Sequence, residues 1–75
     1  MMKELESVVL KRDLPEEGLK AGDLGAVVHL YETADAYEVE FVRADGKTVA
    51  LVTLTPADIR PMMGDEILHV RRLAS

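Results

Sequence analysis

The chain contains no cysteine and no tryptophan, and it has only one phenylalanine and two tyrosines. The absence of cysteine excludes disulfide bonds, thiolate metal sites and cysteine nucleophiles. At 75 residues the chain has room for one domain, and hydrophobic burial alone stabilises a domain of this size by only about 3–5 kcal/mol. Because no disulfide can help, we expect association with a second copy or with another protein.

Long hydrophobic runs are also absent. No apolar run approaches the ~20 residues of a membrane span, and residues 1–7 lack the apolar region of about 7–15 residues found in secretory signals. The sequence therefore predicts no membrane association and a cytoplasmic location.

Basic residues are few, with nine lysines and arginines against fourteen acidic residues and a net charge of −5. Lys11-Arg12 and Arg71-Arg72 are the only adjacent basic pairs, and aromatic residues do not interleave with either pair. An acidic chain repels phosphate backbones unless its basic groups gather on one face. The net charge therefore argues against nucleic acid as a partner.

A glycine-rich reversal precedes the first long apolar run. Gly22 and Gly25 can take positive φ, and Asp23 between them can bond the backbone of the same reversal. The chain then continues directly into a β-branched segment, as expected of a turn that feeds a strand.

Alternating and β-branched segments predict five short strands. We expect them at residues 7–12, 25–31, 37–41, 48–54 and 59–62. Asp45-Gly46 predicts a hairpin whose favoured two-residue turn needs positive φ at both positions. Thr55 and Pro56 predict a single 3₁₀ turn, with Asp58 reaching back toward the Thr55 cap.

These elements predict an all-β fold, a small SH3-like antiparallel barrel. Residues 1–75 would form one domain, with a barrel core at about 5–63 and a C-terminal extension at 64–75. Ile67, Leu68 and Val70 in the extension would be costly to leave in water, so we expect them to pack on the barrel or to mediate self-association as a homodimer.

Candidate catalytic groups are sparse. A metal site on the two histidines, His29 and His69, would need one or two converging carboxylates, which Asp23 or Glu32 could supply. We expect His29 instead on the outer face of its strand. No serine or threonine lies in a nucleophile-elbow setting, and a barrel this small has little space for a desolvated acid–base pair. We predict no enzyme activity, no catalytic residue, no cofactor and no metal site.

Carboxylates and tyrosines are the candidate binding residues. Glu16 and Glu17 lie in the long loop 13–23, which would line the ligand groove of an SH3-like barrel. Glu38 and Glu40 would add negative charge for a basic partner protein, and Tyr31 and Tyr37 would serve as aromatic anchors.

An ordered run of motifs resembles a small bacterial family known as DUF4926 over about residues 3–70. The run consists of Val8-Val9-Leu10, Asp13-Leu14-Pro15, the segment from Gly18 to Gly25, and Tyr37-Glu38-Val39-Glu40-Phe41. The resemblance implies a compact SH3-like protein, often encoded beside unrelated small proteins, with an antitoxin-like role. The element Gly22-Asp23-Leu24-Gly25 is also similar to one in the nitrile hydratase β-subunit and in KOW segments.

Three classes of function follow from these observations. The leading hypothesis is a non-enzymatic protein-interaction module that binds a partner encoded nearby. The first alternative is a structural or accessory subunit of a larger assembly, with an apolar interface at residues 49–54 and the extension. The second alternative is KOW-like nucleic-acid binding, which would require five basic residues to converge on one face, namely Lys11, Arg12, Lys20, Arg71 and Arg72.

Overall fold

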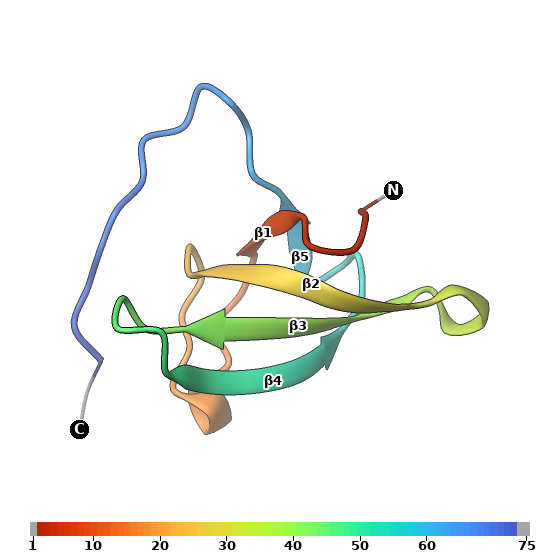
Figure 1. Cartoon of the computed structure of the whole chain (residues 1–75), viewed down its shortest axis with the longest axis horizontal. Helices are drawn as coiled ribbons and strands as arrows, with labels where there is room; N and C mark the ends of the chain where they lie inside the picture. Colours follow the sequence, from red (N-terminus) through yellow and green to blue (C-terminus); the bar gives the residue numbers. More distant parts are fainter. Residues whose placement is uncertain (1, 74–75) are drawn as a thin grey trace.

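The computed structural model describes residues 2–73 (Figure 1). Its elements, in chain order, are β1 (Ser7–Leu10), the 3₁₀ helix η1 (Pro15–Glu17), β2 (Leu24–Tyr31), the 3₁₀ helix η2 (Glu32–Ala34), β3 (Ala36–Val42), β4 (Thr48–Leu54) and β5 (Ile59–Pro61). All five expected strands are present with small differences at their ends; β1, for example, ends at Leu10 and not at Arg12.

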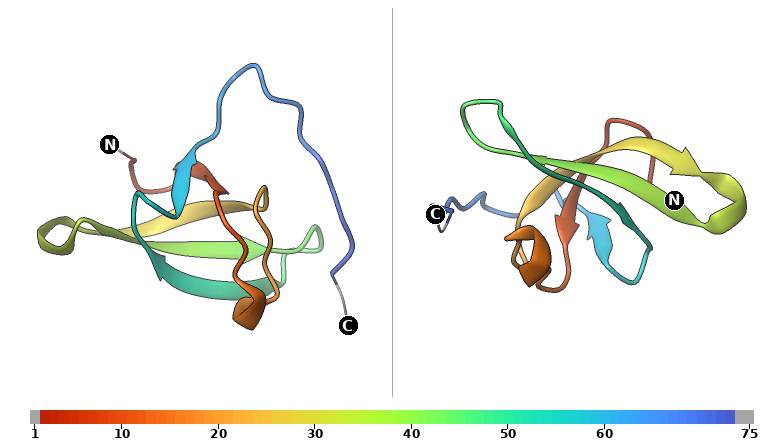
Figure 2. Two further views of the ribbon diagram at one scale, coloured as in Figure 1. Left: turned by 180° about the vertical axis from the view of Figure 1, so that it is seen from behind. Right: turned by 90° about the horizontal axis from the view of Figure 1, so that it is seen from below.

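The strands form one antiparallel sheet in the order β4-β3-β2-β1-β5. Strands β1 to β4 follow one another as neighbours, and β5 returns to pair with β1. Seen from below, β1 and β5 lie across β2, β3 and β4, so the sheet curls over a core (Figure 2). The expected all-β fold of antiparallel strands is confirmed. Because no pairing joins β4 to β5 within residues 2–73, closure into a barrel stays a prediction.

The core lies on the concave side of this sheet and is apolar. Its largest fully buried side chains are Phe41, Leu10, Ile59, Val8, Val27 and Val39. None of the described polar or charged side chains is buried. Burial of each such side chain contributes about 1.5–3 kcal/mol relative to exposure, so these residues supply most of the driving force for folding.

The two glycines of the reversal have different roles. Gly22 takes a φ of 97°, and the Asp23 carboxylate accepts a hydrogen bond from the Lys20 amide at 2.8 Å, as expected. Gly25 does not take positive φ, because it already belongs to β2. Its lack of a side chain serves packing: a Cβ there would lie 2.7 Å from Cγ1 of Val39 and 2.9 Å from Cε1 of Phe41.

A β-bulge interrupts the pairing of β2 with β3 between Val27 and His29. Val27, before the bulge, is fully buried, whereas His29, after it, is exposed. An extra residue in one strand reverses which positions face the core. Before the bulge the odd-numbered Val27 faces the core, whereas after it the even-numbered Leu30 packs against the core and Tyr31 faces solvent. The expected outward position of His29 is confirmed.

The β3–β4 hairpin forms as expected but with a different turn. The Gly46 amide donates to the Arg43 carbonyl at 2.9 Å, and Gly46 alone in the turn has a positive φ, of 88°. The expectation of positive φ at Asp45 is therefore wrong. A three-residue loop ending in a left-handed glycine lets Asp45 keep an ordinary conformation while its carboxylate accepts a bond from the Lys47 amide.

The turn expected after β4 is present at residues 55–58. The Asp58 amide donates to the Thr55 carbonyl at 2.8 Å, and the Asp58 carboxylate accepts a bond from the Thr55 amide at 3.0 Å. The two segments with 3₁₀ geometry are elsewhere, in η1 and η2, where Gly18 and Asp35 end them in left-handed conformations.

Candidate functional site

The convex side of β2, β3 and β4 carries a group of polar and aromatic side chains, which we call the outer face. Its members are His29 and Tyr31 of β2, Glu38 and Glu40 of β3, and Thr48, Leu51 and Thr53 of β4. Strand alternation explains this arrangement, because Tyr37, Val39 and Phe41 of β3 point to the core and the two glutamates between them point outward.

Threonine and tyrosine hydroxyls hold both glutamates of the outer face. Oε1 of Glu38 accepts hydrogen bonds from the Thr53 hydroxyl at 2.8 Å and the Tyr31 hydroxyl at 3.1 Å. Oε2 of Glu40 accepts a bond from the Thr48 hydroxyl at 2.7 Å. Neither glutamate forms an ion pair with a described lysine or arginine. The face therefore presents two oriented carboxylates whose negative charge is not neutralised within residues 2–73.

Aromatic and aliphatic surface borders the carboxylates. The rings of His29 and Tyr31 meet edge to face with centroids 4.6 Å apart. Tyr31 is 40% exposed, and Leu51, opposite Glu40 in the β3–β4 register, is 56% exposed. Such a combination of charge with exposed Tyr and Leu offers a partner both ion pairs and apolar contact.

The hydrogen bond from Tyr31 to Glu38 raises the pKa of the tyrosine above its ordinary value of 10.0. The effect arises mainly from that bond, with smaller contributions from desolvation and from the negative charge of Glu38. We therefore expect the Glu38→Gln variant to lower the pKa of Tyr31 toward its ordinary value.

NMR titration of the Tyr31 ring carbons measures this pKa directly. Glu40→Gln is the matched control, because the Glu40 carboxylate bonds Thr48 and not the tyrosine. An identical Tyr31 titration in wild type and Glu38→Gln would contradict the hydrogen bond described above.

The sequence-predicted binding residues are divided among three places. Tyr31, Glu38 and Glu40 come together on the outer face. Tyr37 is 4% exposed and belongs to the core, so its ring does not provide the expected surface anchor. Glu16 and Glu17 are exposed in η1, in the loop between β1 and β2.

The sequence does not predict Thr48, Leu51 or Thr53 as neighbours of the two glutamates; Leu51 and Thr53 belong only to the apolar interface expected at residues 49–54. Strand alternation places Leu51 and Thr53 on one face of β4, but their positions beside Glu40 and Glu38 depend on the β3–β4 register. That register includes a shift between Phe41 and Val42, which nothing in the local sequence indicates.

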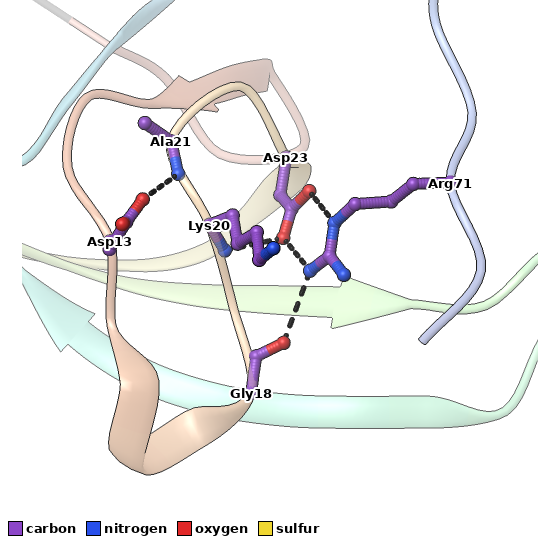
Figure 3. Close-up of polar contacts among 6 residues, drawn as sticks. All are labelled: Asp13, Gly18, Lys20, Ala21, Asp23 and Arg71. Carbon is purple, nitrogen blue, oxygen red and sulfur yellow. Dashed lines mark hydrogen bonds and ion pairs between the residues drawn. The ribbon is translucent and has the colours of Figure 1, made fainter. Parts of the chain in front are cut away.

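We call the C-terminal segment 62–73 the tail. It leaves β5, arches away from the sheet and returns to the end of the β1–β2 loop, just before β2 begins (Figure 1). At its start, Arg60 donates to both carboxylate oxygens of Glu66, at 2.9 and 2.5 Å. At its end, Arg71 donates to both oxygens of Asp23, at 2.9 and 2.6 Å, and to the Gly18 carbonyl at 3.1 Å (Figure 3).

Three apolar side chains of the tail do not cover the sheet. Ile67, Leu68 and Val70 are 94%, 63% and 89% exposed. The expectation that these residues pack on their own domain is therefore wrong, and their role in self-association stays a prediction. The two arginine–carboxylate pairs hold the tail in place, and they leave these three apolar side chains in solvent.

Both carboxylates that anchor the tail have lowered pKa values. Burial tends to raise the pKa of Asp23, but hydrogen bonds from Arg71 and the Lys20 amide lower it below 3.8. Bonds from Arg60 and the Met63 amide lower the pKa of Glu66 to about 2. Because both values are lower than those of free carboxyls, the anchors stabilise the ordered tail at neutral pH and are lost as the pH falls through these lowered values.

We therefore expect the tail to remain ordered at pH 5 and to become mobile in acid, with the Glu66 anchor lost near pH 2 and the Asp23 anchor lost below the ordinary pKa of that carboxyl. Backbone ¹⁵N relaxation of residues 67–73 measures this change. The Arg71→Ala variant should show a mobile segment 69–73 even at neutral pH. Equal order at both pH values in the wild type would contradict the anchoring role of these ion pairs.

The basic residues required for nucleic-acid binding are partly neutralised. Arg12 pairs with Asp58 at 2.6 Å, and Arg71 pairs with Asp23 at the same distance. Within residues 2–73, no group of three His, Asp or Glu side chains is placed to hold a metal ion. None of the described helices has the length and hydrophobicity needed to cross a membrane.

The fold and the outer face define a small, all-β domain with an acidic and aromatic sheet surface. A family model, "Domain of unknown function (DUF4926)", matches residues 4–61, and the chain belongs to this family. The matched range includes every strand and ends before the tail. Searches of curated proteins and of solved structures found no match.

Proposed function

We propose that this chain is a non-enzymatic protein-interaction module whose outer face binds a basic surface of a partner protein. The observation that carries the proposal is the pair of oriented carboxylates, Glu38 and Glu40, on a face where no ion pair within residues 2–73 engages them. Lysine or arginine side chains of a partner would supply the missing positive charge.

The surroundings of the carboxylates support binding at this face. Both glutamates lie on a central strand of the sheet and their bonds to Thr48 and Thr53 hold them, so binding would cost little conformational entropy. Tyr31 would contribute rigid aromatic contact area. The net charge of −5 would speed encounter with a basic partner at low salt.

The proposal extends to the location and identity of the partner. We place the pair in the cytoplasm and expect the partner to be encoded near this chain, as the family resemblance implies. If the partner is a toxin, occupation of its basic surface by Glu38 and Glu40 would neutralise it, and the chain would act as an antitoxin.

A second candidate is a structural subunit that packs through apolar surface. The exposure of Leu51 on β4 and of the apolar tail residues favours this alternative. The two candidates differ in salt dependence, because an apolar interface changes little between 50 and 500 mM salt, while ion pairs at Glu38 and Glu40 weaken.

The test is a parallel capture experiment, run with and without nuclease, that uses three tagged baits: the wild type, Glu38→Lys/Glu40→Lys, and Glu16→Lys/Glu17→Lys. The two double variants change the net charge equally and differ only in where the charge is reversed. A stoichiometric basic protein retained by the wild type and the η1 variant, but lost from the outer-face variant, supports the proposal. A protein lost from the η1 variant alone, or retention that nuclease abolishes, overturns it.

A further inference from the structure

The edge of the sheet formed by β4 is unprotected. β4 is the first strand in the sheet order, so the main-chain N–H and C=O groups on its outer edge have no strand partner among the described residues. Its sequence, Thr-Val-Ala-Leu-Val-Thr-Leu, contains no charged residue and no proline. Edge strands usually carry such residues because they prevent pairing with another chain.

The tail has the complementary property. Residues 67–73 belong to no helix, strand or turn and run as an open trace (Figure 1), and no main-chain hydrogen bond joins them to the main chain of another described residue. Three of their side chains, those of Ile67, Leu68 and Val70, are largely exposed. The segment therefore has unpaired main-chain groups and exposed apolar side chains, as a strand outside a sheet would. Its length of seven residues equals that of β4.

We propose that β4 of one copy accepts residues 67–73 of a second copy as an added strand, and that the exchange is reciprocal. The proposal concerns the main-chain edge of β4, whereas the proposed function concerns side chains of the outer face. Leu51 of β4 and the neighbouring Glu40 lie near both, so the two are tested by separate experiments.

The position of the tail favours a second copy over its own domain. Arg71 is held by Asp23, just before β2, and β3 separates β2 from β4 in the sheet. The tail therefore cannot pair along its own β4 while this anchor is in place. The end of the tail nevertheless lines one groove together with Val49, the second residue of β4, so the donor segment lies near the start of the acceptor strand. A two-fold dimer can then form both pairings in one interface.

Charge also favours a second copy. The segment 67–73 contains no acidic residue, although the whole chain has a net charge of −5. Its Arg71 is already paired with Asp23, but its Arg72 forms no ion pair with a described residue. The acceptor edge lies next to β3, where Glu40 is opposite Leu51. The basic segment of one copy is thus attracted to the acidic body of the other, and the attraction offsets the repulsion between two acidic chains.

Sedimentation equilibrium over a concentration series tests the association. We expect a concentration-dependent dimer of the 8.3-kDa wild-type chain. Val70→Pro removes a main-chain donor from the segment and should raise the dissociation constant at least about tenfold. Because Val70 is 89% exposed and outside every strand, the thermal unfolding of the monomer should not change.

Disulfide trapping identifies the pairing, because the chain has no cysteine of its own. Two single-cysteine variants with different tags, Leu51→Cys and Val70→Cys, are mixed and oxidised. We expect a mixed disulfide dimer from this pair and none from Glu16→Cys mixed with Val70→Cys. A monomer at all concentrations, a dimer that persists in Val70→Pro, or equal trapping at positions 16 and 51 overturns the proposal.

Discussion

Replacement of Gly25 by alanine is expected to lower the free energy of unfolding by about 2–3 kcal/mol, because the new Cβ overpacks the core. It would lie 2.7 Å from Val39 Cγ1 and 2.9 Å from Phe41 Cε1, and both neighbours are essentially fully buried. Neither neighbour can move without displacing others. In a domain of this size the melting temperature should fall by about 10–20 °C, as thermal unfolding followed by circular dichroism would show.

Gly64→Ala is the matched control for this substitution. No atom lies within 4 Å of the position of its Cβ, and its φ is not positive. Its effect on the free energy of unfolding should therefore be within about 0.5 kcal/mol of zero. Equal melting temperatures for the two variants would contradict the close packing of β2 on β3.

Reversal of charge on the outer face has the second large expected effect. Glu38→Lys/Glu40→Lys should weaken binding of the captured basic partner by at least about 2 kcal/mol, or roughly thirtyfold, because repulsion replaces attraction at the centre of the interface. The remaining binding should also depend less on salt. Isothermal titration calorimetry at two salt concentrations measures both quantities.

The Glu16→Lys/Glu17→Lys variant is the control that distinguishes loss of contacts at the outer face from a general effect of net charge on binding. Both double variants have the same net charge, but the glutamates of η1 lie in the loop before β2 and outside the outer face. The η1 variant should bind more slowly at low salt, with a nearly unchanged dissociation rate. Equal losses of affinity in the two variants would mean that the partner responds only to net charge.

The sequence predicted the architecture well because its strands alternate and its turns contain glycine. The alternation of Tyr37, Val39 and Phe41 with two glutamates identified β3, and it also places Tyr37 on the core side. The same alternation predicts the burial of Tyr37, so the expectation of a surface anchor at this residue contradicts the strand pattern.

Other features depend on contacts between distant parts of the chain. The close approach of Gly25 to Phe41 requires the β2–β3 register and the bulge after Val27. The anchor between Arg71 and Asp23 joins residues 48 positions apart. Neither contact leaves a local pattern, because each arises only when the sheet has curled and the tail has returned to it.

The most direct test of the proposed function is chemical-shift mapping of the ¹⁵N-labelled chain as its captured partner is added. If the outer face binds the partner, the largest shifts occur at Glu38, Glu40 and Leu51, while the amides of Glu16 and Glu17 change little. Shifts concentrated at η1 or in the tail, with β3 unaffected, would contradict the assignment of the outer face as the binding site.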